Sequence, residues 1–168
     1  MASSPLDGTP VRAAAPHDPG TFLFGAFELP AVMADIRSTT VNEEEFFASS
    51  RVGNFELSID ATGEDGPTPN EVLVADYASC YTFAFRAGAQ REHDLSLGPI
   101  QTEAVAELDE NDDLASISLT LHVEDDLTDE QVESLTALGE EICHIHSAVG
   151  EELRADIEVV PGATVEGF

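Results

Sequence analysis

Apolar and polar residues alternate along several short segments of the chain, a pattern that predicts β-strands. In residues 54–60 the polar side chains share one face, and the other face carries Phe55, Leu57 and Ile59. A turn at 52–54 precedes this segment, and two strand-like stretches divided by Pro30 lie between residues 22 and 41. The first third of the chain is therefore predicted to form an antiparallel β-meander.

A long helix is predicted to follow. Thr68 is a suitable N-cap, Pro69 suits the first helical position, and Glu71 completes a capping box. The run at 72–89 is almost wholly apolar, with Asp76 and an arginine as its only charges. A helix that is apolar on nearly all sides is expected to be buried.

A second capping box, at 128–131, predicts an amphipathic helix that we expect to end near Gly150. Within this helix Gly139 has no side chain, so a neighbouring element can approach it closely. Alternating patterns predict three more strands, at 100–108, 117–123 and 156–160. In the second of these strands, the residues expected to face inward are Leu119, Leu121 and Val123.

This order of elements predicts an α+β domain. Residues 1–20 contain four prolines and are interpreted as a flexible N-terminal extension, which leaves residues 21–168 as one folded domain. No internal repeat is present in the sequence.

The chain is strongly acidic, with 34 acidic and 6 basic residues and a formal net charge of −28. All the basic residues are arginines. Binding of nucleic acid requires a basic surface, so a nucleic-acid partner is not expected. A surface rich in carboxylates repels itself in dilute buffer and is screened in molar salt. The composition therefore indicates a protein adapted to a high-salt cytoplasm.

No apolar run in the sequence approaches the roughly 20 residues that a membrane span needs. The first residues contain neither the basic segment nor the apolar segment of a secretory signal, so no such signal is predicted. We accordingly expect a cytoplasmic protein with no membrane partner.

The two cysteines are the candidates for chemistry. Cys80 lies in the middle of the first predicted helix, and Cys143 lies near the end of the second. A cysteine on an apolar helix face is often only a small core residue. If both helices pack on one sheet, however, the two thiols can meet, one attacking a substrate and the other closing a disulfide.

Two motifs that contain these cysteines resemble the OsmC/Ohr family. Residues 66–84 read GPTPNEVLVADYASCYTFA and are similar to the family pattern P-x-E-L-L-x-A-x-x-A-C. Residues 140–148 read EEICHIHSA and resemble the second-cysteine segment, commonly C-P-V-S-x-A, although the proline is missing here. The order of predicted elements also matches that of the family.

The resemblance implies an intertwined homodimer, with antiparallel sheets around two central helices and active sites at the subunit interface. It further implies a thiol peroxidase that reduces organic hydroperoxides without a cofactor or metal. Cys80 would be the peroxidatic cysteine and Cys143 the resolving one. An external dithiol would then reduce the disulfide.

In this family an arginine from the N-terminal β segment serves the thiolate, and a glutamate at the start of the cysteine helix holds it. Arg37 is the candidate arginine, with Arg51 as second choice because its sequence context resembles a turn. The glutamate position is shifted by one residue, since the expected site is Asn70 and Glu71 follows it. Asp76, one helical turn before Cys80, is an alternative partner for the arginine.

Two alternatives remain at the level of sequence. One is an OsmC-like dimer without catalysis that binds a small apolar ligand near Phe83 and Phe85. The other is a soft-metal site made by the cysteines with His144 or His146. The remaining histidines are predicted to lie in the tail, at a helix end and on a solvent-facing strand, at His17, His93 and His122.

Overall fold

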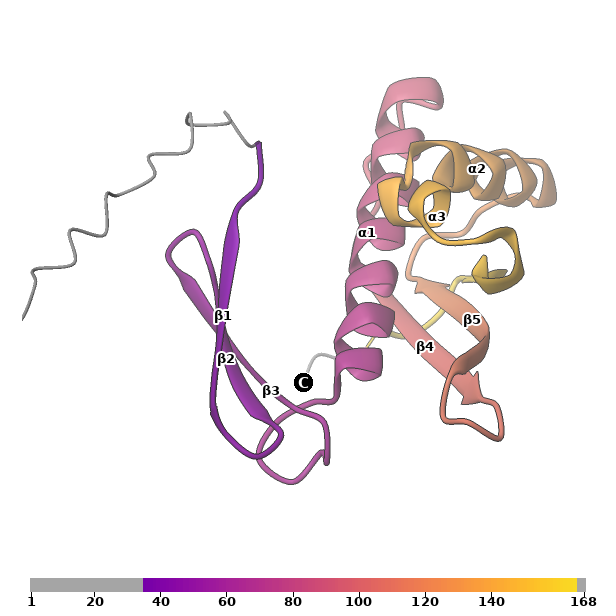
Figure 1. Ribbon diagram of the computed structural model, residues 1–168. Helices are drawn as coiled ribbons and strands as arrows, with labels where there is room; N and C mark the ends of the chain where they lie inside the picture. Colours follow the sequence, from indigo (N-terminus) through magenta and orange to yellow (C-terminus); the bar gives the residue numbers. More distant parts are fainter. Residues whose placement is uncertain (1–34, 166–168) are drawn as a thin grey trace, which may run out of the picture. The chain divides into compact units, whose positions relative to one another are not determined.

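The computed structural model describes residues 35–165, and its first sheet is the predicted meander. It comprises β1 (Ser38–Glu44), β2 (Phe47–Val52) and β3 (Phe55–Asp60), paired antiparallel in that order (Figure 1). Strand β3 and its preceding turn confirm the prediction from alternation, and Gly53, with φ of +60°, supplies the left-handed backbone of that turn. Most of the predicted strands between 22 and 41 lie outside the described residues.

The placement of Arg51 in a turn was wrong, because β2 extends from Phe47 to Val52 and includes it. Its neighbours Ser49 and Ser50 gave no strong strand signal. Pairing with β1 on one side and β3 on the other nevertheless holds this polar segment extended. Tertiary pairing here outweighs local propensity.

Helix α1 (Pro69–Glu92) begins where its capping signals predicted. Thr68 accepts a hydrogen bond from the backbone N–H of Glu71, and the Glu71 carboxylate accepts one from the backbone N–H of Thr68. The expectation that this helix is buried on all sides is only partly correct. In the single chain Leu73 is 40% exposed and Phe83 is 70% exposed.

The second sheet contains β4 (Ile100–Leu108), β5 (Leu114–Val123) and β6 (Asp156–Pro161), in that order. Strands β4 and β5 form an antiparallel hairpin, whereas β6 pairs parallel to β5. The expectation of purely antiparallel sheets was therefore wrong for the pair of β5 and β6. The helical segment between β5 and β6 carries the chain back to the start of β5, as a parallel connection requires.

That connection is α2 (Asp129–Ile142), α3 (His144–Ala148) and the single 3₁₀ turn Glu151–Leu153. Thr128 and Gln131 form the predicted capping box of α2. The prediction of one helix continuing to Gly150 was wrong, because the backbone of Cys143 is extended, with φ −68° and ψ 111°. Because of this break, Cys143 is both the C-cap of α2 and the N-cap of α3.

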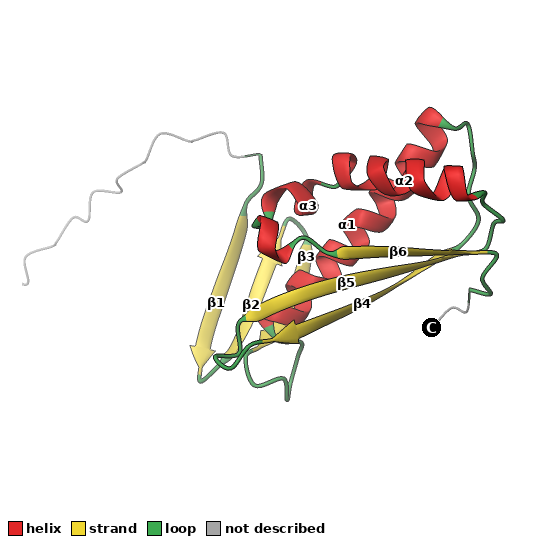
Figure 2. Cartoon of the chain, turned by 90° about the vertical axis from the view of Figure 1, so that its right-hand side faces the viewer, coloured by secondary structure: helices red, strands yellow, loops and turns green. Residues whose placement is uncertain are grey.

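The hydrophobic core lies between these helices and the second sheet (Figure 2). Strand β5 contributes the alternate residues predicted to face inward, and they pack against large buried side chains of α1 such as Tyr77 and Tyr81. Gly139 on α2 is covered by the Tyr81 ring, from which a Cβ at that position would be 2.8 Å away. The predicted close approach at Gly139 is thus confirmed.

Candidate functional site

Cys80 lies near the middle of α1, on the side of the helix that packs on the core. Its side chain is half-buried and packs against the cluster that contains Cys143. A thiol in this position is partly open to solvent and to a small reactant.

Cys143 is fixed by the break between α2 and α3. Only 1% of its surface is exposed. Its backbone N–H donates to the Gly139 carbonyl at 2.9 Å, and its Sγ accepts the backbone N–H of His146 at 3.4 Å. The sulfur is thereby the side-chain cap of α3.

The structure places the two thiols next to each other, an arrangement that the sequence left as a possibility. Both cysteines are free. Burial raises the pKa of Cys143 to about 11, the His146 N–H opposes this rise, and the adjacent Cys80 thiol adds to it. Cys143 is consequently a protonated thiol near neutral pH, shielded from solvent and adjacent to a more accessible one. Two such thiols can be converted reversibly to a disulfide.

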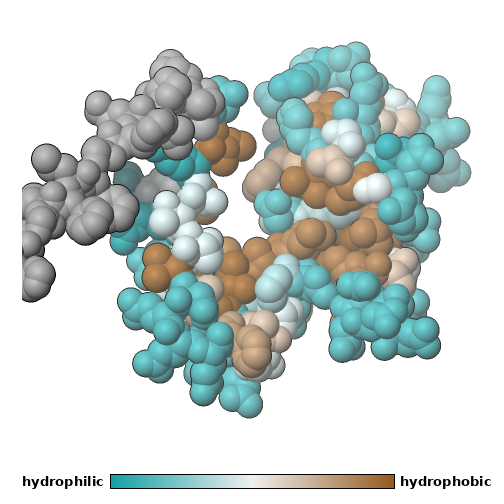
Figure 3. Space-filling model, in the orientation of Figure 1, coloured by the Kyte–Doolittle hydropathy of each residue, from teal (hydrophilic) through white to brown (hydrophobic). Residues whose placement is uncertain are grey.

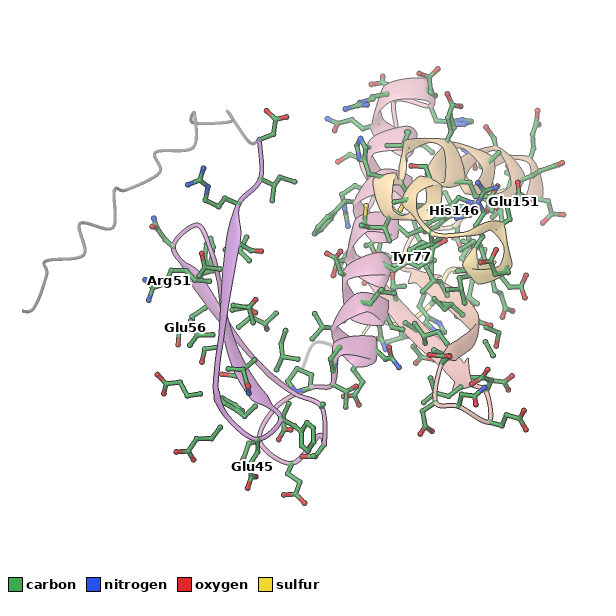
Figure 4. All side chains as sticks on the ribbon, viewed as in Figure 1. Glu45, Arg51, Glu56, Tyr77, His146 and Glu151 are labelled. Carbon is green, nitrogen blue, oxygen red and sulfur yellow. The ribbon has the colours of Figure 1, made fainter. Side chains whose placement is uncertain are left out.

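A second contact joins the same two segments, and no motif in the sequence predicted it. The Tyr77 hydroxyl lies 2.7 Å from His146 Nδ1 and accepts the backbone N–H of Ala155 at 3.1 Å (Figure 4). Tyr77 is fully buried, and burial raises its pKa. Burial lowers the pKa of His146, with a smaller opposing effect of Glu140 and a further lowering by Arg154. Because the hydroxyl already accepts the Ala155 N–H, both groups are satisfied when it donates its own proton to Nδ1 of a neutral ring, and we assign the ring proton to Nε2 on this basis.

The sequence contained a signal for this pair. Tyr77 precedes Cys80 by three residues, and His146 follows Cys143 by three residues. Residues three apart on a helix are neighbours on its surface. By residue type, the two histidines near Cys143 suggest metal ligands, and this property does not indicate a contact with a tyrosine on another helix.

Glu71 is held by the cap of α1. Its carboxylate accepts the backbone N–H of Thr68 at 2.7 Å and the Thr68 hydroxyl at 3.0 Å, and these bonds lower its pKa. Asn70, at the position usual for the glutamate, donates to the backbone carbonyl of Asp112 at 3.3 Å. Asp76 is exposed on α1.

Both candidate arginines belong to the β1–β3 region. Arg37 immediately precedes β1 and is exposed, whereas Arg51 pairs with Glu56 across β2 and β3 at 3.7 Å. Within residues 35–165, no ion pair or hydrogen bond joins an arginine to Cys80, Cys143 or Glu71. A single chain thus does not assemble an arginine–thiolate pair from the described residues.

The soft-metal alternative lacks a ligand set in the part of the chain that the structure describes, where no group of three His, Cys, Asp or Glu residues could hold a metal ion. The His146 ring contacts Tyr77 instead. His93 lies at the end of α1 beside Ser134, as its position in the sequence predicted. His122 lies on β5 near Glu103, but its side chain is half-buried and its Nε2 atom is inaccessible, so the prediction that it faces solvent is only partly correct. His17 lies outside the described residues.

Phe83 and Phe85 do not form a common ligand site. Phe85 is fully buried in the core, whereas Phe83 is 70% exposed. A cavity of about 730 Å³ lies elsewhere, between the start of α1 and the β4–β5 hairpin. Its apolar lining is supplied by Val74, Ala75, Ala104, Ala106, Leu108 and Leu114.

None of the helices among the described residues is long and apolar enough to span a membrane.

Known proteins resemble this chain in sequence and in fold. The family described as OsmC-like protein matches residues 61–158. An uncharacterized protein of Haloferax volcanii is 50% identical over 131 residues, which are 78% of this chain and 99% of the relative.

Solved structures agree on the fold. The OsmC-like protein of Mycoplasma pneumoniae superposes with a TM-score of 0.68 at 14% identity, over 77% of this chain and 98% of that one. The organic hydroperoxide resistance protein OhrB of Bacillus subtilis gives a TM-score of 0.58 at 18% identity, over 74% and 97%.

The fold and the two cysteines thus define an α+β protein of the OsmC/Ohr type, as the two sequence motifs indicated. The chain belongs to the OsmC-like protein family. Its identity to a Haloferax protein supports the prediction of a halophilic member.

Proposed function

We propose that this protein is a thiol-dependent peroxidase that reduces organic hydroperoxides. The observation that carries the proposal is the pairing of a half-buried Cys80 on α1 with a fully buried Cys143 at the α2–α3 break. The name of the Bacillus subtilis relative in fold, an organic hydroperoxide resistance protein, supports the substrate class.

Cys80 is the proposed peroxidatic residue because its sulfur is the accessible one. Its thiolate attacks the outer oxygen of R–O–O–H, the O–O bond breaks, and the alcohol R–OH leaves with a proton, so that Cys80 becomes a sulfenic acid. The Cys143 sulfur then attacks Cys80 Sγ, releasing water and forming the disulfide. An external dithiol reduces that disulfide by two electrons and restores both thiols.

A homodimer is part of the proposal, because the single chain leaves much apolar surface uncovered (Figure 3). Phe55 on β3 is 82% exposed and Phe83 on α1 is 70% exposed. Large apolar side chains exposed to this extent are typical of an interaction site. We propose that a second protomer covers these apolar side chains. In the dimer, Arg37 would reach a Cys80 thiolate while Glu71 holds the arginine in place, with Arg51 as the alternative arginine. The chain is proposed to function in the cytoplasm.

The test is consumption of an organic hydroperoxide and of hydrogen peroxide by wild-type protein in molar KCl with a dithiol. We expect faster turnover of the organic peroxide, loss of turnover in Cys80→Ser, and one fast equivalent followed by slow turnover in Cys143→Ser. Peroxide consumption no faster than that of folded Cys80→Ser would overturn the proposal.

The cavity beside the start of α1 favours a second candidate function, binding of a small apolar ligand without catalysis. Its volume of about 730 Å³ and its lining of valine, alanine and leucine side chains suit an aliphatic molecule. Binding of a fluorescent fatty acid, reduced by filling the cavity with Ala104→Phe, would support it. Equal binding to wild type and Ala104→Phe would exclude this cavity.

A further inference from the structure

We propose that Tyr77 and His146 are positioning residues for the resolving cysteine: their hydrogen bond holds the Cys143 turn against α1, so that Cys143 Sγ attacks the sulfur of Cys80. We call this contact the Tyr77–His146 latch. The inference rests on the proposed thiol chemistry, but its test below requires no peroxide.

The spacing of the residues is the first argument. Tyr77 and Cys80 lie three residues apart on α1, and Cys143 and His146 lie three residues apart at the start of α3. Tyr77 contacts His146, and the Cys80 thiol neighbours that of Cys143. Two adjacent contacts thus join the same pair of segments, and loosening one allows the other to move.

The second argument is the anchoring of the latch. The Tyr77 hydroxyl is fixed on its other side by the backbone N–H of Ala155, and the tyrosine is fully buried. The hydroxyl is therefore a rigid point to which the short helix α3 is attached. Formation of a disulfide requires Cα atoms about 4.4–6.8 Å apart, so a small displacement of the turn slows it.

The third argument concerns the sulfur itself. The backbone N–H of His146 donates to Cys143 Sγ at 3.4 Å, while the side chain of the same residue is held by Tyr77. A bond from an N–H stabilises the thiolate that forms as Cys143 loses its proton during attack. The latch keeps this donor in place.

Protonation of His146 should loosen the latch, because Nδ1 then becomes a donor and the buried Tyr77 hydroxyl loses the acceptor for its own proton. The other groups that act on this ring are Glu140 on α2, which favours the charged form, and Arg154 after the 3₁₀ turn, which disfavours it. Attack by Cys143 should consequently slow on the acid side in a manner that depends on His146.

The test uses an aromatic disulfide reagent, dithiobis(nitrobenzoate), in molar KCl. The Cys80 thiolate attacks the reagent, releases one coloured thiolate and retains the other as a mixed disulfide. Cys143 then attacks Cys80 Sγ, releasing the second coloured thiolate and a proton as the internal disulfide forms. The second phase measures resolution alone, and Cys143→Ser must lack it.

We expect Tyr77→Phe and His146→Ala to slow the second phase about 3- to 10-fold, as loss of one hydrogen bond implies, and to leave the first phase unchanged. Matched controls are Tyr81→Phe, which removes another buried hydroxyl bond on α1, and His144→Ala, which removes an exposed histidine of α3. Neither control should slow the second phase.

His146→Asn separates positioning from general destabilisation. Its Oδ1 takes the place of Nδ1 and accepts the Tyr77 hydroxyl, but it does not titrate. We expect a near-wild-type second phase whose acid-side slowing specific to His146 is gone. Equal second-phase rates in Tyr77→Phe, His146→Ala and their controls would overturn the latch. Failure of wild type to consume peroxide, with the latch results as expected, would overturn only the proposed function.

Discussion

At the scale of single residues, the two capping boxes of this chain form a natural comparison. Thr68 is paired with Glu71, and Thr128 is paired with Gln131, in the same geometry. The Thr68 bonds lower the pKa of Glu71, so the folded state prefers the carboxylate. The stability from this preference is present above the ordinary pKa of 4.5 and is lost as pH falls through the lower folded value.

We therefore expect Glu71→Gln to retain the cap at neutral pH and to be less sensitive to acid than wild type. Thermal unfolding in molar KCl from pH 7 down to pH 3 measures this difference. Glu71→Ala is the comparison that loses the cap and unfolds more easily at every pH. An unchanged acid response in Glu71→Gln would contradict the prediction. A loss of peroxide turnover in a normally stable Glu71→Gln would instead support its proposed role beside an arginine.

At the scale of elements, the packing of α2 against α1 fixes the position of Cys143, which directly follows α2. A Cβ on Gly139 would lie 2.8 Å from the Tyr81 ring, so one helix must shift to accept it. We expect Gly139→Ala to lower the free energy of unfolding by about 1–3 kcal/mol and to slow disulfide formation, because Cys143 follows α2.

Urea unfolding in molar KCl provides the measurement, with Gly88→Ala on α1 as the control. There a Cβ would be 3.1 Å from Leu138 Cβ, a milder conflict that the better helix propensity of alanine partly offsets. A smaller effect in Gly139→Ala than in Gly88→Ala would show that the contact with Tyr81 yields easily.

How much of these elements could be predicted depended on whether the signal was local. Both helix starts, β3 and the inward residues of β5 were correctly predicted, since capping and alternation are read from a few neighbouring residues. The polar strand β2 and the break at Cys143 depend on partners distant in sequence. Among site residues, the sequence allowed Cys80 to meet Cys143. The matching spacings of Tyr77 and His146 from the two cysteines become a signal only when the two segments are known to pack together.

At the scale of the whole molecule, charge and exposed apolar surface act against each other. The net charge of −28 repels a second copy, whereas exposed residues such as Phe55 and Phe83 favour one. Repulsion between the two charged protomers has a range of about 10 Å at 0.1 M salt and about 3 Å at 1 M. The free energy gained by burying apolar surface is not screened by salt in this way. We therefore expect the chain to be a dimer in molar KCl and to dissociate as salt is removed.

Light scattering coupled to size exclusion, from 0.1 M to 3 M KCl, measures the mass directly. Phe83→Ser should weaken the dimer at every salt concentration, because it removes an apolar contact and leaves the charge unchanged. Val105→Ser removes an apolar residue that is 63% exposed on β4, on the face of its sheet turned away from the core, and should leave the dimer intact. A monomer across the whole range would contradict the dimer. An unchanged mass in Phe83→Ser would instead assign the contact to another surface, and equal weakening by both variants would show that apolar surface in general, rather than this face of α1, holds the protomers together.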